Sequence, residues 1–339
     1  MEYGLYSRED LKKEYEKVLK EYESLKSKGL KLDMSRGKPC SSQLDLGEEL
    51  FSNISGKDCI VDNFDIRNYG LLEGIGPCRK LMADVLGVKP SQVFVGGNAS
   101  LSLMYGVLTV AYVNGLRGCT PWGKLDGFKF LCPAPGYDRH FAMSGDFGAE
   151  LVTIPMTDEG PDMDAVEEAV KDPAVKGIWC VPKYSNPTGV IYSDAVIERF
   201  AALKPAAEDF VIMWDNAYLV HEFRGDYKPF PDIISLQEKM GGTAAIYEFF
   251  STSKITLPGA GVSCVAASED DLKGISAHWG YQTISYDKIN QLRHVKYLKS
   301  REHMLEIMKK HAEIIRPKFD IFVKSFEDEL EGLGIASWT

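Results

Sequence analysis

The sequence predicts an α/β protein built on a mainly parallel central sheet with helices on both faces. From about residue 92 onward, short apolar runs alternate with helical stretches. Apolar runs of this length, several of them separated by helices, are typical of parallel strands that are buried on both faces. Because ligands of such sheets bind at the carboxyl ends of the strands, the residues just after each run are the candidates for function. The predicted strands cover residues 92–96, 128–132, 149–155, 176–182, 209–215, 244–251 and 261–267.

Two helical regions flank the predicted sheet. Residues 8–28 place leucine, valine and tyrosine at helical spacing among many charges, which predicts an amphipathic helix that lies on a larger body. Residues 285–330 form a second, longer helical pattern with Pro317 as its only obvious break.

We expect three regions: an N-terminal helix and arm belonging to a small domain (1–60), a large α/β domain (61–284), and a connecting helix that begins a C-terminal small domain (285–339). The chain stops at Thr339, where a strand would be expected to begin. The small domain is therefore expected to be incomplete.

Composition excludes several classes of function. The 339 residues carry a formal net charge of -10 without a dense Lys/Arg run, which argues against a nucleic-acid partner. The 7 cysteines form no CxxC pair and the 6 histidines show no ligand spacing, so neither a disulfide framework nor a metal site is expected. The N-terminus is charged where a signal peptide is apolar, and no apolar stretch is long enough to span a bilayer. We therefore expect a cytoplasmic protein with no membrane partner.

Polar residues follow three neighbouring predicted strands. Asn186 lies in SNPTG after residues 176–182, Asp215 ends the run 209–215 and is followed by Tyr218 in DNAY, and Lys254 lies in STSK after residues 244–251. Each motif alone has an ordinary explanation, since NPTG can be a simple turn and a loop lysine is usually a solvated charge. Together they supply what one cofactor needs.

Pyridoxal 5'-phosphate requires a lysine amine for a Schiff base, an acid that faces the pyridine nitrogen, and hydrogen-bond donors at the phenolic oxygen. Lys254, Asp215 and the pair Asn186 with Tyr218 match these three requirements. Tyr137 follows the run 128–132, where its ring could stack on the pyridine ring or be a core tyrosine. Asp215 would set the strength of the electron sink, because it keeps the ring nitrogen protonated.

The cofactor phosphate also needs a binding site. Gly97, Asn98 and Ala99 lie between the run 92–96 and a helical stretch, and the free N–H groups at a helix start favour an anion. Ser251 and Ser253, beside Lys254, could add hydroxyl donors.

These motifs resemble those of the fold-type I, class I aminotransferases, most closely the type Ic aspartate aminotransferase branch. The resemblance covers nearly the whole chain in the expected order and is carried by LDMSRGKP (32–39), RNYGLLEGIGPCRKLMADVLGV (67–88), VGGNASL (95–101), PAPGYDRH (133–140), SNPTGV (185–190), WDNAY (214–218) and STSKITLPGAG (251–261). It implies the fold of that enzyme class, pyridoxal 5'-phosphate as cofactor, and transfer of an amino group from an amino acid, aspartate by branch, to a 2-oxo acid such as 2-oxoglutarate. It also implies a homodimer with shared active sites.

The resemblance further implies a role for each matching residue. Lys254 looks like the lysine of the internal aldimine, which later serves as the general base, and Asp215 looks like the partner of the ring nitrogen. The other implied roles are hydrogen bonds to the phenolic oxygen (Asn186, Tyr218), stacking (Tyr137), phosphate binding (Gly97, Asn98, Ala99, Ser251), a place near the substrate carboxylate (Gly37) and contact with the phosphate of the other subunit (Tyr69). Asn186 and Arg36 are further candidates for substrate binding.

The sequence departs from the family in two places. Val262 stands where most relatives have an arginine for the cofactor phosphate, and the arginine for the substrate α-carboxylate would lie beyond Thr339. Arg36 and Arg293 are open either as partners of a substrate side-chain carboxylate or as packing residues. Three other functions stay open: a carbon-sulfur lyase or decarboxylase on the same scaffold, a fragment that binds the cofactor without turnover, and the sensor domain of a transcription regulator.

Overall fold

The computed structural model describes residues 2–32, 37–225 and 227–335. Contacts divide the chain into two compact units, one made of Met1–Gln43 with Lys310–Thr339 and the other of Leu44–Lys309. The three regions expected from the sequence have other boundaries than these two units, and the division into three stays a prediction. No helix in the described ranges is both long and apolar enough to cross a membrane.

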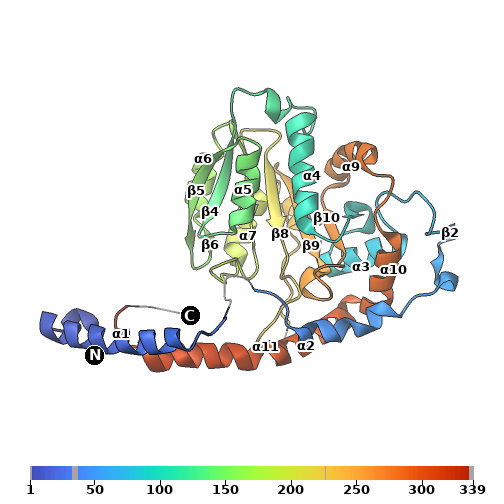
Figure 1. Cartoon of the computed structure of the whole chain (residues 1–339). Helices are drawn as coiled ribbons and strands as arrows, with labels where there is room; N and C mark the ends of the chain where they lie inside the picture. The colour runs from blue at the N-terminus through green and yellow to red at the C-terminus, as the bar shows by residue number, and fades with distance from the viewer. Residues whose placement is uncertain (1, 33–36, 226, 336–339) are drawn as a thin grey trace. The chain divides into compact units, whose positions relative to one another are not determined.

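The second unit is built on a mixed sheet (Figure 1). Its described strands number eight, in the order β3-β10-β9-β8-β7-β4-β5-β6. Neighbours from β9 through β8, β7 and β4 to β5 are parallel, whereas β10 is antiparallel to both β3 and β9 and β6 is antiparallel to β5. All the predicted strands are present, so the mainly parallel sheet is confirmed. The strands are β3 (Val93–Val95), β4 (Lys129–Ala134), β5 (Glu150–Thr157), β6 (Gly160–Pro161), β7 (Val175–Cys180), β8 (Val211–Asp215), β9 (Ala245–Ser251) and β10 (Ser263–Ala266), beside a separate pair β1 (Ile60–Val61) and β2 (Phe64–Asp65).

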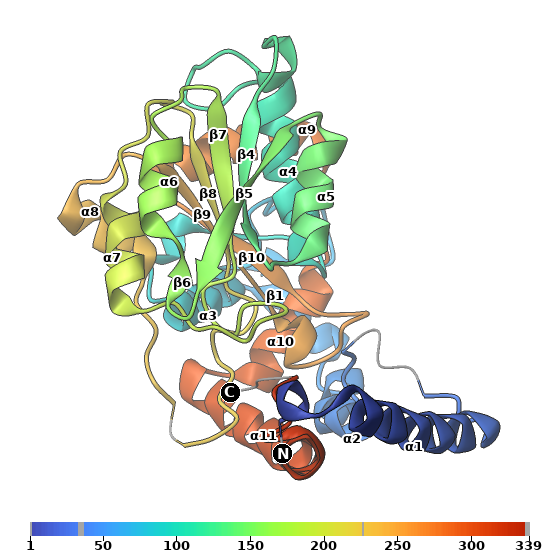
Figure 2. The same ribbon diagram turned by 90° about the vertical axis from the view of Figure 1, so that its left-hand side faces the viewer.

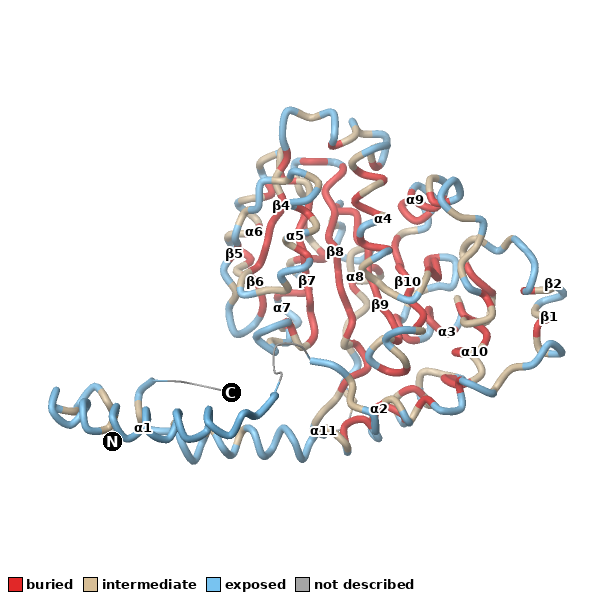
Figure 3. Tube along the Cα trace, in the orientation of Figure 1, coloured by how far each residue is buried: buried red, intermediate tan, exposed pale blue. Residues whose placement is uncertain are grey.

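Helices cover both faces of the sheet. Figure 2 shows α6, α7 and α8 on one face and α4, α5 and α9 on the other. The strands β3, β10, β9, β8, β7 and β4 are largely buried, and their side chains alternate between two apolar clusters, whereas β5 is mostly exposed (Figure 3). The helices of this unit are α3 (Gly76–Leu86), α4 (Ser100–Val113), α5 (Asp138–Asp146), α6 (Met163–Ala169), α7 (Asp194–Ala202), α8 (Ile233–Met240), α9 (Glu269–Gln282) and α10 (Lys288–Leu298).

The N-terminal helix is confirmed as α1 (Arg8–Ser27), and Ser7 begins it by accepting a hydrogen bond from the backbone of Asp10. Its apolar stripe, Leu11, Tyr15, Val18, Leu19, Tyr22 and Leu25, is between 40% and 64% exposed. The short helix α2 (Ser41–Leu44) follows it in the chain.

The predicted position of the break in the C-terminal helical pattern is wrong. α10 ends at Leu298 and α11 (Arg301–Leu330) begins after Lys299, whose φ is +59°, while Pro317 lies inside α11. Ser300 starts the new helix, because its hydroxyl accepts a hydrogen bond from the backbone of His303 at 3.3 Å. The proline is tolerated because the carbonyl that it leaves unbonded belongs to Glu313, which is exposed to water.

A buried ion pair ties the segment after β7 to the segment after β8. The Lys183 ammonium is 3% exposed and donates to Glu222 Oε1 at 2.7 Å and to the Leu219 carbonyl at 3.0 Å. The Tyr184 hydroxyl donates to the other Glu222 oxygen at 3.1 Å. Burial lowers the pKa of Lys183, and Glu222 opposes that shift. The two segments that carry Asn186 and Tyr218 are thereby held to each other.

Gly177 is predicted to be required at the centre of the sheet. A Cβ there would lie 2.5 Å from the Phe130 ring and 2.7 Å from Val211 Cγ2, both on neighbouring strands. We expect Gly177→Ala to lower the free energy of unfolding by about 1–3 kcal/mol in urea titrations. Gly274→Ala, in α9 with open space around its Cβ, is the control and should raise that energy by about 0.5–1 kcal/mol. Equal effects of the two variants would contradict this packing.

Glu222→Gln is predicted to destabilise the protein, because it leaves the Lys183 ammonium buried without its counter-charge. We expect a loss of about 3 kcal/mol in the free energy of unfolding at neutral pH, measured by urea titration. The control is Glu168→Gln, which breaks the ion pair with Lys171 whose side chains are 76% and 68% exposed, and should cost less than about 1 kcal/mol. Similar losses in both variants would show that the buried ion pair contributes no more to stability than the exposed one.

Candidate active site

Three of the predicted site residues follow or end β7, β8 and β9. Asn186 follows β7, Asp215 is the last residue of β8, and Lys254 ends a single 3-10 turn (Thr252–Lys254) that follows β9. Because these strands are parallel neighbours, their ends lie at the same edge of the sheet. The Lys254 ammonium lies 4.8 Å from the centre of the Tyr218 ring.

The loop that carries Lys254 is closed at its base. The Thr252 amide donates to the Val262 carbonyl at 2.9 Å, and the Val262 amide donates to Thr252 Oγ1 at 2.9 Å. Directly beyond this closure, Ser251 pairs with Ser263 across β9 and β10. The lysine therefore projects from a short loop whose two ends are fixed to each other.

Asp215 is a buried carboxylate with one oxygen left open. Its Oδ2 lies 3.2 Å from His140 Nε2, at ion-pair distance but without hydrogen-bond geometry, and its Oδ1 has no hydrogen-bond partner among the described residues. A buried acceptor without a partner is costly, so a bound donor would be favoured there. Burial, with the negative charge of Asp215 as a second cause, raises the pKa of the nearby Tyr218.

His140 is a site residue that the sequence reasoning missed. It is 1% exposed and stacks on Trp179 with ring centres 4.3 Å apart, while Trp179 Nε1 donates to Ser144 Oγ at 2.7 Å. Tyr137 lies edge-on to His140 at 4.9 Å, and both line a small cavity. The available signal was the spacing of Tyr137 and His140, three residues apart at a helix start, which places them on one face.

The loop before α4 is bound to the lysine loop. Ser253 Oγ donates to the Asn98 carbonyl at 3.2 Å, and Ser263 Oγ donates to the Gly97 carbonyl at 2.9 Å. Ala99 precedes α4 in an extended conformation and no side chain caps the helix, so the first N–H groups stay free for an anion. Ser251 is 4% exposed at the end of β9.

For the other predicted residues the structure gives their exposure and surroundings but no contact with the groups described above. Asn186 is exposed in its loop, and Tyr69 is 76% exposed. Gly37 is an exposed residue of the first unit, and Arg36 lies outside the described residues. Arg293 lies in α10, where its backbone carbonyl accepts a hydrogen bond from the side-chain Nδ2 of Asn53 at 2.9 Å.

These groups fit pyridoxal 5'-phosphate. The sheet edge holds an amine beside a phenol, a carboxylate whose open oxygen can face a ring nitrogen, and an uncapped helix start for a phosphate. Val262, at the position of the arginine expected from the family, is 1% exposed and brings no charge. In the described ranges, no group of three His, Cys, Asp or Glu side chains is placed to hold a metal ion.

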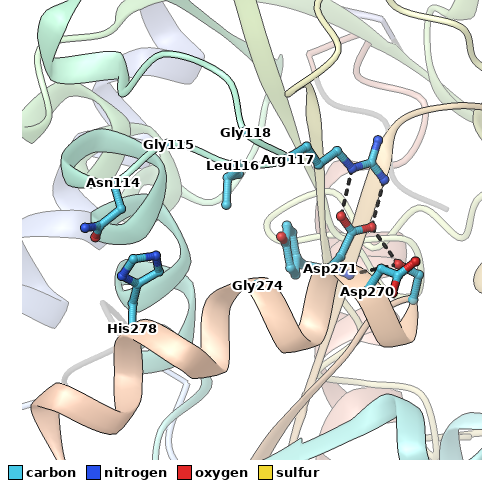
Figure 4. A pocket seen from close by; sticks show the side chains of 11 residues that line it. Asn114, Gly115, Leu116, Arg117, Gly118, Asp270, Asp271, Gly274 and His278 are labelled. Atoms are coloured by element: carbon cyan, nitrogen blue, oxygen red, sulfur yellow. Dashed lines mark hydrogen bonds and ion pairs between the residues drawn. The ribbon is translucent and has the colours of Figure 1, made fainter.

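A larger cavity lies elsewhere, between the end of α4 and α9, with a volume of about 650 Å³. Figure 4 shows Asn114 and His278 on one side of it and Arg117 with Asp271 on the other. Both Arg117 nitrogens that face Asp271 lie 2.7 Å from its oxygens, so the charge of this arginine is already met. None of the residues predicted for the site lines this cavity, and it offers no amine for the cofactor.

Comparison with known proteins identifies the family. The family model described as aspartate amino-transferase matches residues 6–339. An aspartate aminotransferase of Corynebacterium glutamicum is 43% identical over 328 residues, which cover 96% of this chain and 76% of the relative. A putative aminotransferase of Mycolicibacterium smegmatis is 42% identical over 344 residues, covering 100% of this chain and 80% of the relative.

A solved structure agrees with this assignment. The crystal structure of an aspartate transaminase from Corynebacterium glutamicum superposes with a TM-score of 0.96 at 42% identity, and covers 100% of this chain and 80% of the other. The family match extends over nearly the whole chain, and the residues at the sheet edge fit the cofactor that aminotransferases of this family use. This chain therefore belongs to the aspartate aminotransferase family and is a pyridoxal-phosphate-dependent transaminase of fold type I.

Proposed function

We propose that this transaminase takes the amino group of aspartate and delivers it to 2-oxoglutarate. The observation that carries the proposal is the arrangement at the sheet edge, where the Lys254 amine lies beside Tyr218 and the same strand ends carry Asp215 with its open oxygen. The choice of aspartate is supported by the name of the Corynebacterium glutamicum relative, aspartate aminotransferase.

Lys254 would hold the cofactor and move the proton. When bound, pyridoxal 5'-phosphate supplies an electron sink for the carbon that loses its proton. Lys254 Nζ would attach the cofactor through its aldehyde and, once freed by the substrate amine, would take the proton from the substrate α carbon. The closed base of the lysine loop supports this double role, because it keeps the amine in one region of the site.

Asp215 would keep the ring nitrogen protonated. Its Oδ1 is open while His140 lies against its Oδ2, so one oxygen is held and the other is available. Tyr218 and Asn186 would donate to the phenolic oxygen, and Tyr137 would stack on the ring.

The phosphate would bind at the start of α4. Gly97, Asn98 and Ala99 would offer backbone N–H groups there, with Ser251 and Ser253 as hydroxyl donors. The hydrogen bond from Ser253 to the Asn98 carbonyl supports this, because it brings the two loops to the same place.

Substrate and partner would complete the site. We assign Gly37, Arg36 and Asn186 to substrate binding, and Tyr69 to the phosphate of a second subunit in a homodimer. The 76% exposure of the Tyr69 ring supports the last assignment, since a large aromatic side chain in solvent is available to a partner. A cytoplasmic location is supported by the 7 cysteines, all within the described ranges and all free thiols.

Lys254→Ala tests the attachment. Borohydride treatment of the wild-type holoenzyme should fix the cofactor to the peptide that contains Lys254, and the variant should lose about 10²–10⁴-fold in kcat with aspartate and 2-oxoglutarate, because it has neither the attaching amine nor the base. Lys171→Ala, at a side chain that is 68% exposed, is the control and should behave as wild type. Fixation at another lysine, or release of ammonia without a 2-oxo acid acceptor, would refute the proposal.

Asp215→Asn tests the electron sink. Removing the charge should lower kcat by about 10²–10³-fold while KM for aspartate changes little, because the variant cannot keep the ring nitrogen protonated. Steady-state kinetics at saturating cofactor measure the two effects separately. Asp126→Asn, the same change at an exposed loop residue, should alter neither parameter. A loss confined to KM would assign Asp215 to substrate binding instead.

A further inference from the structure

A second buried acid lies next to the proposed active site and forms no ion pair with any residue that the structure describes. Glu248 of β9 and Asn216, which directly follows Asp215, are each 1% exposed. Asn216 Nδ2 donates to Glu248 Oε1 at 2.7 Å. The other two oxygens of this pair, Glu248 Oε2 and Asn216 Oδ1, have no hydrogen-bond partner among the described residues.

The surroundings of Glu248 disfavour a negative charge. Its register partner on β8 is Trp214, and Trp214, Ile246 and Phe250 belong to one apolar cluster on that face of the sheet. In the described part of the chain, the ionisable groups coupled to it electrostatically are Asp232, at the start of α8, and Cys264 on β10, and neither brings a positive charge. The pKa of Glu248 is raised to about 8: burial is the largest cause, the hydrogen bond from Asn216 opposes it, and the negative charge of Asp232 adds to it.

The two open oxygens indicate where a proton lies. An ionised carboxylate and an amide oxygen are both acceptors only, so neither can satisfy the other. A protonated carboxyl has one O–H donor, and the donor side of the amide already binds Oε1. Placing the proton on Oε2 converts two unpaired buried acceptors into one hydrogen bond, which removes the cost of leaving both unpaired.

We propose that Glu248 is held as a neutral carboxylic acid whose Oε2–H donates to Asn216 Oδ1, which closes a ring of two hydrogen bonds between acid and amide. This ring makes Glu248 a positioning residue for Asp215 and Tyr218. Asn216 is also held by its backbone, because its amide donates to the Phe249 carbonyl at 2.8 Å and its carbonyl accepts from the Leu219 amide at 3.2 Å. The positioning role, but not the ring itself, rests on the function proposed above.

The protonation state can be measured without cofactor or activity. In apoprotein, the infrared band of a protonated carboxylic acid should be present at pH 7, shift in D2O, and be absent from Glu248→Gln. The same band should persist in the control Glu238→Gln, which changes an exposed acid on α8. A wild-type spectrum without such a band would overturn the proposal.

The pH dependence of stability gives a second, independent measurement. The unfolded chain ionises Glu248 near the ordinary pKa of about 4.3, whereas the folded chain keeps the proton to about pH 8. The stability contributed by the neutral acid is therefore full below the unfolded pKa and is lost as pH rises to the folded pKa.

Glutamine keeps the donor and cannot ionise, so Glu248→Gln should fold at least as well as wild type at pH 7. The ratio of its folding equilibrium constant to that of wild type should rise by about tenfold per pH unit between pH 5 and 8 and then level off. Glu238→Gln should show no such slope. A Glu248→Gln variant that is destabilised to the same extent at every pH would contradict the neutral acid, and the infrared spectrum of the wild type decides the question if the variant does not fold.

The positioning role is tested by affinity for pyridoxal 5'-phosphate, measured by titrating the apoprotein. Glu248→Leu leaves both the oxygen and the nitrogen of the Asn216 side-chain amide unpaired. The dissociation constant of this variant for pyridoxal 5'-phosphate should therefore rise by about tenfold, whereas Glu248→Gln should bind the cofactor as tightly as wild type. Equal affinities for Gln and Leu variants would overturn the positioning role. A positive infrared result with no cofactor binding by wild type would instead refute the proposed function and leave the ring in place.

Discussion

The parallel pairing of β7, β8 and β9 is the constraint on which the site depends. Asp215 ends β8 and Lys254 lies just after β9, so the register of their pairing brings these two residues to the same edge of the sheet, to which the loop that carries Asn186 also leads from β7. The buried apolar residues of these strands fix that register, since a shift by one residue would turn every side chain to the opposite face. The same packing that stabilises the core therefore also positions the site residues at the strand ends.

The end of β8 separates two acids by the faces of the sheet. Asp215 points to the face that carries His140 and Trp179, whereas Asn216, the next residue, points to the opposite face and binds Glu248. Asp215 has a histidine beside its carboxylate, whereas Glu248 is bound by an amide and packed among apolar side chains on the opposite face. Because successive side chains of a strand point to opposite faces of the sheet, two adjacent residues are enough to give the two acids different surroundings.

Most of the fold and the main residues of the candidate site could be predicted from the sequence, because both follow from local patterns. Buried strands appear as apolar runs, and Lys254, Asp215 and Asn186 are recognised by where those runs end. The contacts of His140 and Glu248 could not be predicted, since their partners lie 75 and 32 residues away along the chain. The helix break was misplaced for a local reason: Pro317 looked like the stronger signal, yet Ser300 has the hydroxyl that starts a new helix. The roles assigned to the site residues stay proposals.

The closed base of the lysine loop has a consequence for how the lysine travels. With Thr252 bonded twice to Val262, the backbone around residue 254 has little freedom, and any displacement of the amine must come from rotation about the bonds of its own side chain. A tether of four methylene groups sweeps only a small volume. The amine would thus remain at high effective concentration near its target after release, and its return would require no rearrangement of the main chain.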